Sequence, residues 1–149
     1  MKLALVLLAL ACMVACTDNG NSTIGISGNV NVSGTWLYST SNVQSNPITC
    51  SSSGTMLTLT QQGTTVTGTF SGGTLTCSGG GAPPSSALTS GTIAAGTASG
   101  STVAFDLGGN YWHNTGTAGG TSMSGAVTLL VALNNMNYTL TGTWVATKQ

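Results

Sequence analysis

From Val30 onward, apolar residues alternate with Thr, Ser and other small polar residues over short runs, which Gly, Asn and Ser interrupt. Alternation with a period of two is typical of β-strands that have one buried face, and this region shows no helical period. The pattern predicts eight strands, at residues 30–39, 55–61, 64–71, 91–98, 101–107, 111–118, 121–133 and 136–147.

The segments between these strands are short enough for tight hairpins, whose turns favour Gly and Asn. The predicted two-residue turns are Gln62-Gly63, Ser99-Gly100, Gly119-Gly120 and Asn134-Asn135. Each turn sets the register of its hairpin. The residues then predicted to lie opposite one another are Leu59 and Val66, Val103 and Gly96, Phe105 and Ala94, Trp112 and Val127, Leu129 and Leu140, and Gly125 and Trp144. All these pairs put the large apolar residues on one face and the Thr and Ser residues on the other.

One apolar face and eight sequential antiparallel strands favour an up-and-down barrel with the apolar face inside. Closure also removes exposed sheet edges, which a chain with only 3% charged residues has few charges to protect. The prediction is an all-β protein with a single up-and-down antiparallel eight-stranded barrel over residues 30–149. Glycines predicted to face inward, where they ease bends and make room for rings, are Gly34, Gly68, Gly96, Gly116, Gly125 and Gly142.

The first sixteen residues, MKLALVLLALACMVAC, are typical of an export signal, since Lys2 precedes an apolar stretch of secretory length. The stretch MVAC at residues 13–16 resembles a bacterial lipobox, in which the Cys is lipidated and becomes the new N-terminus. Cys12 is a second candidate, and ordinary cleavage that releases a secreted protein is the alternative. Polar residues 17–29 predict a flexible tether. We therefore expect an exported lipoprotein, periplasmic or on the cell surface, that is attached to the membrane through a lipid on Cys16.

The formal net charge is zero and no basic patch exists, which excludes nucleic acid as a partner. No apolar run reaches the roughly 18–20 residues that span a bilayer. Outside the export signal, two cysteines remain, Cys50 and Cys77. A disulfide between them is favoured over a metal site, because the exported compartment preserves disulfides and the single His lies far away in the sequence. No metal or cofactor is expected.

Acid–base chemistry has few candidate residues in this chain. A two-residue turn at positions 109–110 places Asp106 opposite His113, and Thr115 or Ser124 nearby suggests a catalytic triad. An exposed cross-strand ion pair is the favoured interpretation, since a triad also needs a cleft and an oxyanion hole. We therefore expect that the protein is not an enzyme.

The motif Gly34-Thr35-Trp36 lies on the first predicted strand, and Lys148 lies at the end of the last. A Gly-x-Trp motif on the first strand of an eight-stranded barrel resembles the calycins, which include lipocalins, fatty-acid-binding proteins and avidins. The resemblance implies that Lys148 packs across Trp36 at the closed end of the barrel, where relatives usually carry Arg. The short hairpins look closer to avidins, but the last strand lacks the acid of the avidin ligand site, so biotin binding is not inferred.

The favoured function is a non-catalytic module that binds a small apolar ligand, and the alternative is a structural or protein-interaction barrel with a packed core. No protein partner is identified. The arrays of Thr on the outer face also suggest a face that binds ice or contacts another surface, but barrel twist argues against the flat plane that ice binding requires. Inward residues predicted to line a ligand site are Trp36, Tyr38, Phe70, Phe105, Trp112, Asn114, Tyr138 and Trp144.

Overall fold

The computed structural model describes residues 28–83, 86–88, 90–109, 111–133 and 136–149. Within these ranges the regular structure consists of strands alone. They are β1 (Gly34–Ser45), β2 (Ile48–Gln62), β3 (Thr65–Ser71), β4 (Thr74–Ser78), β5 (Ser86–Ala87), β6 (Gly91–Ser99), β7 (Thr102–Leu107), β8 (Trp112–Gly119), β9 (Ser122–Leu133) and β10 (Met136–Lys148). The predicted lipidation site, Cys16, and the rest of the export signal lie outside the described residues.

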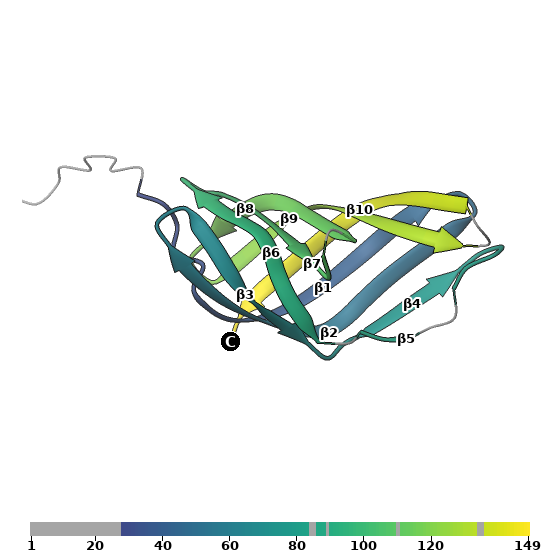
Figure 1. The fold of residues 1–149 in the computed structure, drawn as a ribbon, viewed down its shortest axis with the longest axis horizontal. Helices are drawn as coiled ribbons and strands as arrows, with labels where there is room; N and C mark the ends of the chain where they lie inside the picture. The colour runs from purple at the N-terminus through teal and green to yellow at the C-terminus, as the bar shows by residue number, and fades with distance from the viewer. Residues whose placement is uncertain (1–27, 84–85, 89, 110, 134–135) are drawn as a thin grey trace, which may run out of the picture.

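Eight of the strands close into a barrel (Figure 1). Going around it, β1, β2, β3, β6, β7, β8, β9 and β10 each pair antiparallel with the next, and β10 pairs with β1 to complete the circle. The prediction of an up-and-down eight-stranded barrel is therefore confirmed. The prediction lacked β4 and β5, which form a small flap: β4 pairs with the first part of β2, and β5 pairs with β4.

Two of the predicted registers are correct. In β9–β10, Leu129 lies opposite Leu140 and Gly125 lies opposite Trp144. In β7–β8, Asp106 lies opposite His113. The residues at 110 and 134–135 lie outside the described part of the chain. The pair Leu133–Met136 agrees with a two-residue connection, whereas the innermost pair of β7–β8, Leu107–Trp112, leaves four residues between the strands.

Three other hairpins are shifted by two residues from the predicted register. Their turns begin at Gly63, Gly100 and Gly120, one residue later than expected, and each of these glycines has a positive φ, of 61°, 57° and 21°. A tight hairpin turn favours Gly at its first position for this reason. The observed pairs are Leu59 with Gly68, Val103 with Ala98, and Trp112 with Leu129.

A shift of two residues leaves every side chain on its predicted face, because strand side chains alternate with a period of two. Most of the core is therefore built from predicted inward positions, and Thr residues predicted to face outward, such as Thr58 and Thr139, are exposed. The core also includes Ile93, which the prediction put on the outer face, and residues outside the predicted strands: Val43, Ile48 and Cys50. One predicted pair fails for another reason. A bulge at Ala95, whose φ is 49°, places Ala94 opposite Asp106 instead of Phe105.

Inward glycines allow the large rings to span more than one strand. Trp144 on β10 lies opposite Gly125 on β9, which lies opposite Gly116 on β8. Across these two glycines the indole Nε1 of Trp144 reaches β8 and donates a hydrogen bond of 3.1 Å to Thr115 O. A Cβ atom at Gly125 would stand 2.5 Å from Gly116 Cα, so the strands also approach closely here.

One end of the barrel is closed by the hairpins at Gly63, Gly100 and Gly120 and by residues 28–33, which cross it. Val30 N donates a hydrogen bond of 2.8 Å to Gly100 O, and Val32, which is 0% exposed, lies inside. Residues 28–33 therefore belong to the folded barrel and seal it.

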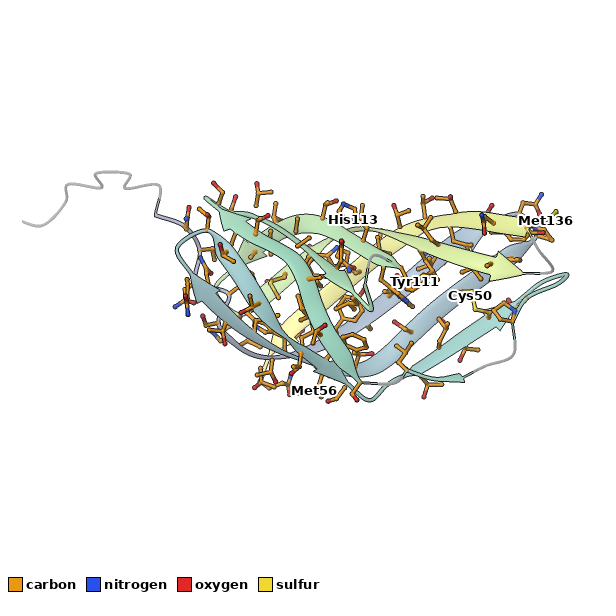
Figure 2. All side chains as sticks on the ribbon, viewed as in Figure 1. Cys50, Met56, Tyr111, His113 and Met136 are labelled. Atoms are coloured by element: carbon orange, nitrogen blue, oxygen red, sulfur yellow. A yellow bond between two sulfur atoms is a disulfide. The ribbon has the colours of Figure 1, made fainter. Side chains whose placement is uncertain are left out.

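The other end is open and uneven. β1, β2, β9 and β10 extend beyond the shorter strands, and the flap of β4 and β5 lies beside the extension (Figure 1). Cys50 and Met136 mark this extended end in Figure 2. A disulfide joins Cys50 on β2 to Cys77 on β4, which confirms the predicted pairing and fastens the flap to the barrel wall.

Candidate functional site

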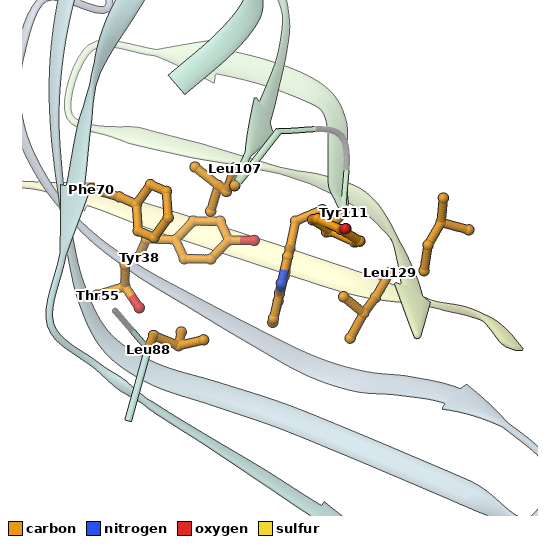
Figure 3. A pocket seen from close by; sticks show the side chains of 10 residues that line it. Tyr38, Thr55, Phe70, Leu88, Leu107, Tyr111 and Leu129 are labelled. Atoms are coloured by element: carbon orange, nitrogen blue, oxygen red, sulfur yellow. The ribbon is translucent and has the colours of Figure 1, made fainter. Parts of the chain in front are cut away.

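A cavity of about 360 Å³ lies at the open end of the barrel (Figure 3). Its wall is almost entirely apolar and combines strands β1, β2, β3, β7, β8 and β9 with the flap segment and the β7–β8 connection. Its lining residues are Tyr38, Thr55, Phe70, Leu88, Leu107, Gly108, Tyr111, Trp112, Leu129 and Leu130.

A bulge in β2 lies directly beside Thr55, which lines this cavity. Thr40 on β1 lies opposite Ser52, whereas Tyr38 lies opposite Thr55, so β2 contains one extra residue between the two pairs. Gly54, with a φ of 75°, supplies the left-handed backbone conformation at this point. Thr55 faces inward with the residues that follow it at alternate positions in β2, and the bulge shifts the alternation by one residue so that Ser52 also faces inward.

Tyr38 and Asn114 form a buried polar pair behind the apolar wall. The Tyr38 hydroxyl donates a hydrogen bond of 2.7 Å to Asn114 Oδ1, and Asn114 Nδ2 donates to Phe105 O at 3.3 Å and to Trp112 O at 3.2 Å. Both side chains are 0% exposed, and burial raises the pKa of the Tyr38 hydroxyl far above its ordinary value. The pair is therefore neutral, and both hydrogens of the Asn114 amide are in use.

Thr55 is different from the other inward hydroxyls. Its Oγ1 is buried and has no hydrogen-bond partner among the described residues. Thr40 and Ser52, also buried, bond to each other at 2.9 Å. A buried hydroxyl without a partner is uncommon and costs free energy, so it requires an explanation.

The aromatic residues in and beside the cavity form two groups. Tyr38, Phe105 and Trp144 pack together in the middle, with the ring centroid of Trp144 lying 6.0 Å from that of Tyr38 and 5.2 Å from that of Phe105. Phe70 and Trp112 stand at the open end and line the cavity with Tyr38. The barrel interior is thus filled at its centre and hollow at one end.

The structure brings together three of the eight predicted lining residues, Tyr38, Phe70 and Trp112, and puts Asn114 directly behind them. Phe105 and Trp144 belong to the central cluster, Trp36 lies at the closed end, and Tyr138 packs against the core outside the cavity wall. Strand alternation alone could have added Leu107 and Leu129. Alternation with Leu59 could also have added Thr55, whereas Leu88, Gly108 and Tyr111 lie in connections without a periodic pattern.

At the closed end, Lys148 lies across Trp36. Its Nζ is 5.3 Å from the centroid of the indole, and the two residues are register partners of β10 and β1. The lysine stem also packs on Gly34, where a Cβ atom would stand 3.0 Å from Lys148 Cε. Trp36 Nε1 donates to Val32 O at 2.8 Å, so its ring holds the crossing segment as well. These contacts stabilise the closed end.

Asp106 and His113 form the predicted cross-strand pair, through Asp106 Oδ1 and His113 Nδ1. The prediction of a fully exposed pair is wrong in one respect, because the Asp106 side chain is only 9% exposed while that of His113 is 57% exposed. Among the described residues, Thr115 and Ser124 make no hydrogen bond with His113.

Within the described ranges, no group of three or more His, Cys, Asp or Glu residues gathers as metal ligands. No helix in the same part of the chain has the length and hydropathy of a membrane-spanning segment.

The fold and the site thus define a closed eight-stranded antiparallel barrel with an apolar cavity at one end. Comparisons of the chain with family models, with curated proteins and with solved structures find no match.

Proposed function

We propose that this protein is a non-catalytic module that binds a small, mainly apolar ligand in the cavity at the open end of the barrel. The observation that carries the proposal is the cavity itself, about 360 Å³ in volume and walled by Phe70, Leu107, Trp112 and Leu129. Ligand sites are typically apolar hollows of roughly 300–1,000 Å³ with few polar groups. A dry apolar cavity of about 150 Å³ already accepts benzene, so this one suits a ligand of two or three rings.

The resemblance to calycins supports the same function. Those barrels are closed at the end that carries Gly-x-Trp and hold their ligands within the barrel. Here Gly34, Trp36 and Lys148 pack together at the closed end, while the cavity lies at the other. The departure from the family pattern is the central cluster of Tyr38, Phe105 and Trp144, which leaves only the open end hollow.

That filled centre is also the observation that favours the alternative, a barrel with no ligand that acts as a structural or protein-interaction module. The two functions differ in what co-purifies with the protein. Native mass spectrometry followed by organic extraction should reveal a bound small molecule if the barrel is a binder. Repeated absence of any such molecule, together with a failure to take up apolar probes, favours the packed module.

Uptake of N-phenyl-1-naphthylamine, an uncharged amine with a naphthyl and a phenyl group that fluoresces in apolar sites, tests the cavity directly. Leu88→Trp introduces a large ring into the cavity wall and is expected to abolish uptake. Leu37→Trp makes the same change at a residue that is 42% exposed on the outer face of β1, and it should leave uptake unchanged. Equal uptake by both folded variants would place the probe elsewhere and contradict the proposal.

Export and lipid attachment through Cys16 are part of the proposed function, and they rest on the apolar stretch followed by MVAC and a polar segment. Labelling with palmitate in a bacterial host should depend on this residue. Cys16→Ser is expected to abolish labelling, and Cys12→Ser, the matched control, is expected to retain it. Unchanged labelling of Cys16→Ser would refute the attachment.

A further inference from the structure

We propose that the ligand of this cavity is electrically neutral and carries a hydroxyl or similar group that forms a hydrogen bond with Thr55 Oγ1. This inference rests on the proposed function and specifies the chemical class of the ligand. It comes from two features of the cavity, the absence of charge from its wall and the buried, unpaired hydroxyl of Thr55 among the described residues.

The first feature concerns charge. None of the residues that line the cavity carries a charged side chain. In the described part of the chain, the ionisable Lys, His and Asp side chains lie elsewhere: Lys148 is at the closed end, and Asp106 pairs with His113. A carboxylate or an ammonium group that entered the cavity would lose its hydration without meeting an opposite charge, which is strongly unfavourable. The wall therefore selects against charged amphiphiles.

The second feature is Thr55. Its side chain lines the cavity beside Leu88 and Tyr38 (Figure 3), and its Oγ1 is buried with no partner in the described structure. On another side the hydroxyl is covered by Gly73, where a Cβ atom would collide with Oγ1. In Figure 3 the hydroxyl points to the side of Leu88, which also lines the cavity, so a ligand group seated against this part of the wall can satisfy it.

The neighbouring polar groups cannot replace such a ligand. Asn114 already donates both amide hydrogens and accepts from Tyr38. The buried hydroxyls of Thr40 and Ser52 satisfy each other. Thr55 is thus left with one donor and two acceptor positions, which match a neutral group that both donates and accepts, such as an alcohol or a phenol.

A matched set of three ligands tests this inference: naphthalene, 2-naphthol and 2-naphthoate at neutral pH, with affinities measured by titration of the intrinsic fluorescence. Trp112 lines the cavity and should report binding, whereas Trp36 and Trp144 do not line it. We expect 2-naphthol to bind about three- to tenfold more tightly than naphthalene, as one net hydrogen bond allows. 2-Naphthoate should bind at least about tenfold more weakly than 2-naphthol, because its charge has no partner.

Variants at Thr55 assign the preference to this residue. Thr55→Val keeps the shape but removes the hydroxyl, so it should bind naphthalene and 2-naphthol equally well. It should also unfold at an equal or higher temperature, because a buried unpaired hydroxyl is gone. Thr55→Ser retains the hydroxyl and should keep the preference for 2-naphthol.

The outcomes separate the two proposals. Tightest binding of 2-naphthoate, or an unchanged preference for 2-naphthol in Thr55→Val, overturns the neutral hydrogen-bonding ligand but leaves the binding function intact. Binding of none of the three compounds, with no uptake of N-phenyl-1-naphthylamine, overturns the binding function itself. The wild-type comparison of 2-naphthol with 2-naphthoate needs no variant, so it decides the question of charge even if Thr55→Val does not fold.

Discussion

Raising the pH is expected to destabilise the barrel through Tyr38. Its hydroxyl is 0% exposed, and it donates to Asn114 Oδ1 at 2.7 Å. Ionisation would place an anion against this carbonyl oxygen, while both hydrogens of the Asn114 amide are already donated to Phe105 O and Trp112 O. Burial therefore raises the pKa of Tyr38 in the folded protein, and the ring stays protonated as long as the barrel is folded.

The sign and size of the effect follow from proton linkage. In the unfolded chain Tyr38 titrates near its ordinary pKa of 10.0. Above this pH the unfolded state releases a proton that the folded state keeps, so the free energy of unfolding falls by about 1.4 kcal/mol for each pH unit. The contribution is fully present below the unfolded pKa and is lost progressively as the pH rises above it toward the folded pKa.

Urea unfolding of the wild type and Tyr38→Phe, measured on both sides of the ordinary tyrosine pKa, isolates this proton. Tyr38→Phe should cost about 1–3 kcal/mol at neutral pH, because Asn114 Oδ1 loses its donor. Its stability should then decline less steeply with pH, by one proton. Tyr111→Phe, at a ring that is 63% exposed, is the control and should follow the wild type. Parallel pH dependences of the wild type and Tyr38→Phe, or phenolate absorbance from Tyr38 in the folded barrel near the ordinary pKa, would refute the reasoning.

Three further substitutions test the packing of the barrel by chemical denaturation. Replacing Cys50 and Cys77 together by Ser should lower the free energy of unfolding by about 3 kcal/mol, since the disulfide joins residues separated by 27 positions. Gly125→Ala should cost about 1–3 kcal/mol or more, because the new Cβ would stand 2.5 Å from a backbone atom of the next strand. Lys148→Met keeps a long stem but removes the cation that lies 5.3 Å from the Trp36 ring, and it should cost about 0.5–1 kcal/mol.

Each of these substitutions has a matched control. Reduction of the wild-type disulfide should reproduce the loss in the double Ser variant, and unchanged stability in both would mean that the disulfide does not stabilise the barrel. Gly119→Ala should be neutral, since a Cβ atom there has no neighbour within 4 Å. Lys148→Arg should keep the stability that Lys148→Met loses. Equal stability of the wild type and both variants would show that the cation on Trp36 does not stabilise the barrel.

The inward face of most strands could be predicted from the sequence, although three turns were predicted one residue too early. Moving a two-residue turn by one residue shifts the pairing by two residues, which leaves each side chain on the same face. Leu59, Val103 and Trp112 all point inward as expected, although each lies opposite a residue two positions away from its predicted partner. Glycine indicates where a tight turn occurs, so the hairpins could be located. The pattern does not indicate which of two adjacent turn positions the glycine occupies, so the register was predicted wrongly.

The bulges could not be predicted, and they change which residues face inward in the neighbouring parts of the strands. The register shifts near Asn42, Gly54 and Ala95, whose φ angles are 51°, 75° and 49°. Only one of the three is a glycine, and no residue type is required at a bulge, so the local sequence gives no clear signal. Alternation with Leu59 does put Thr55 on the inward face, but the pattern does not show that its hydroxyl lacks a partner.

The cavity itself arises from a difference in strand length, which no face pattern reports. β7 has 6 residues and β8 has 8, whereas β9 and β10 have 12 and 13. Beyond the hydrogen bond from Leu130 N to Tyr111 O, β9 continues to Leu133 and pairs there with β10. At about 3.4 Å per residue, the longer strands project well past the end of the shorter ones, so the barrel wall is incomplete on one side there. The disulfide-linked flap supplies part of that wall through Leu88. The open end is therefore hollow because the short strands end before the long ones. At the closed end all the strands finish together, and side chains pack around Trp36.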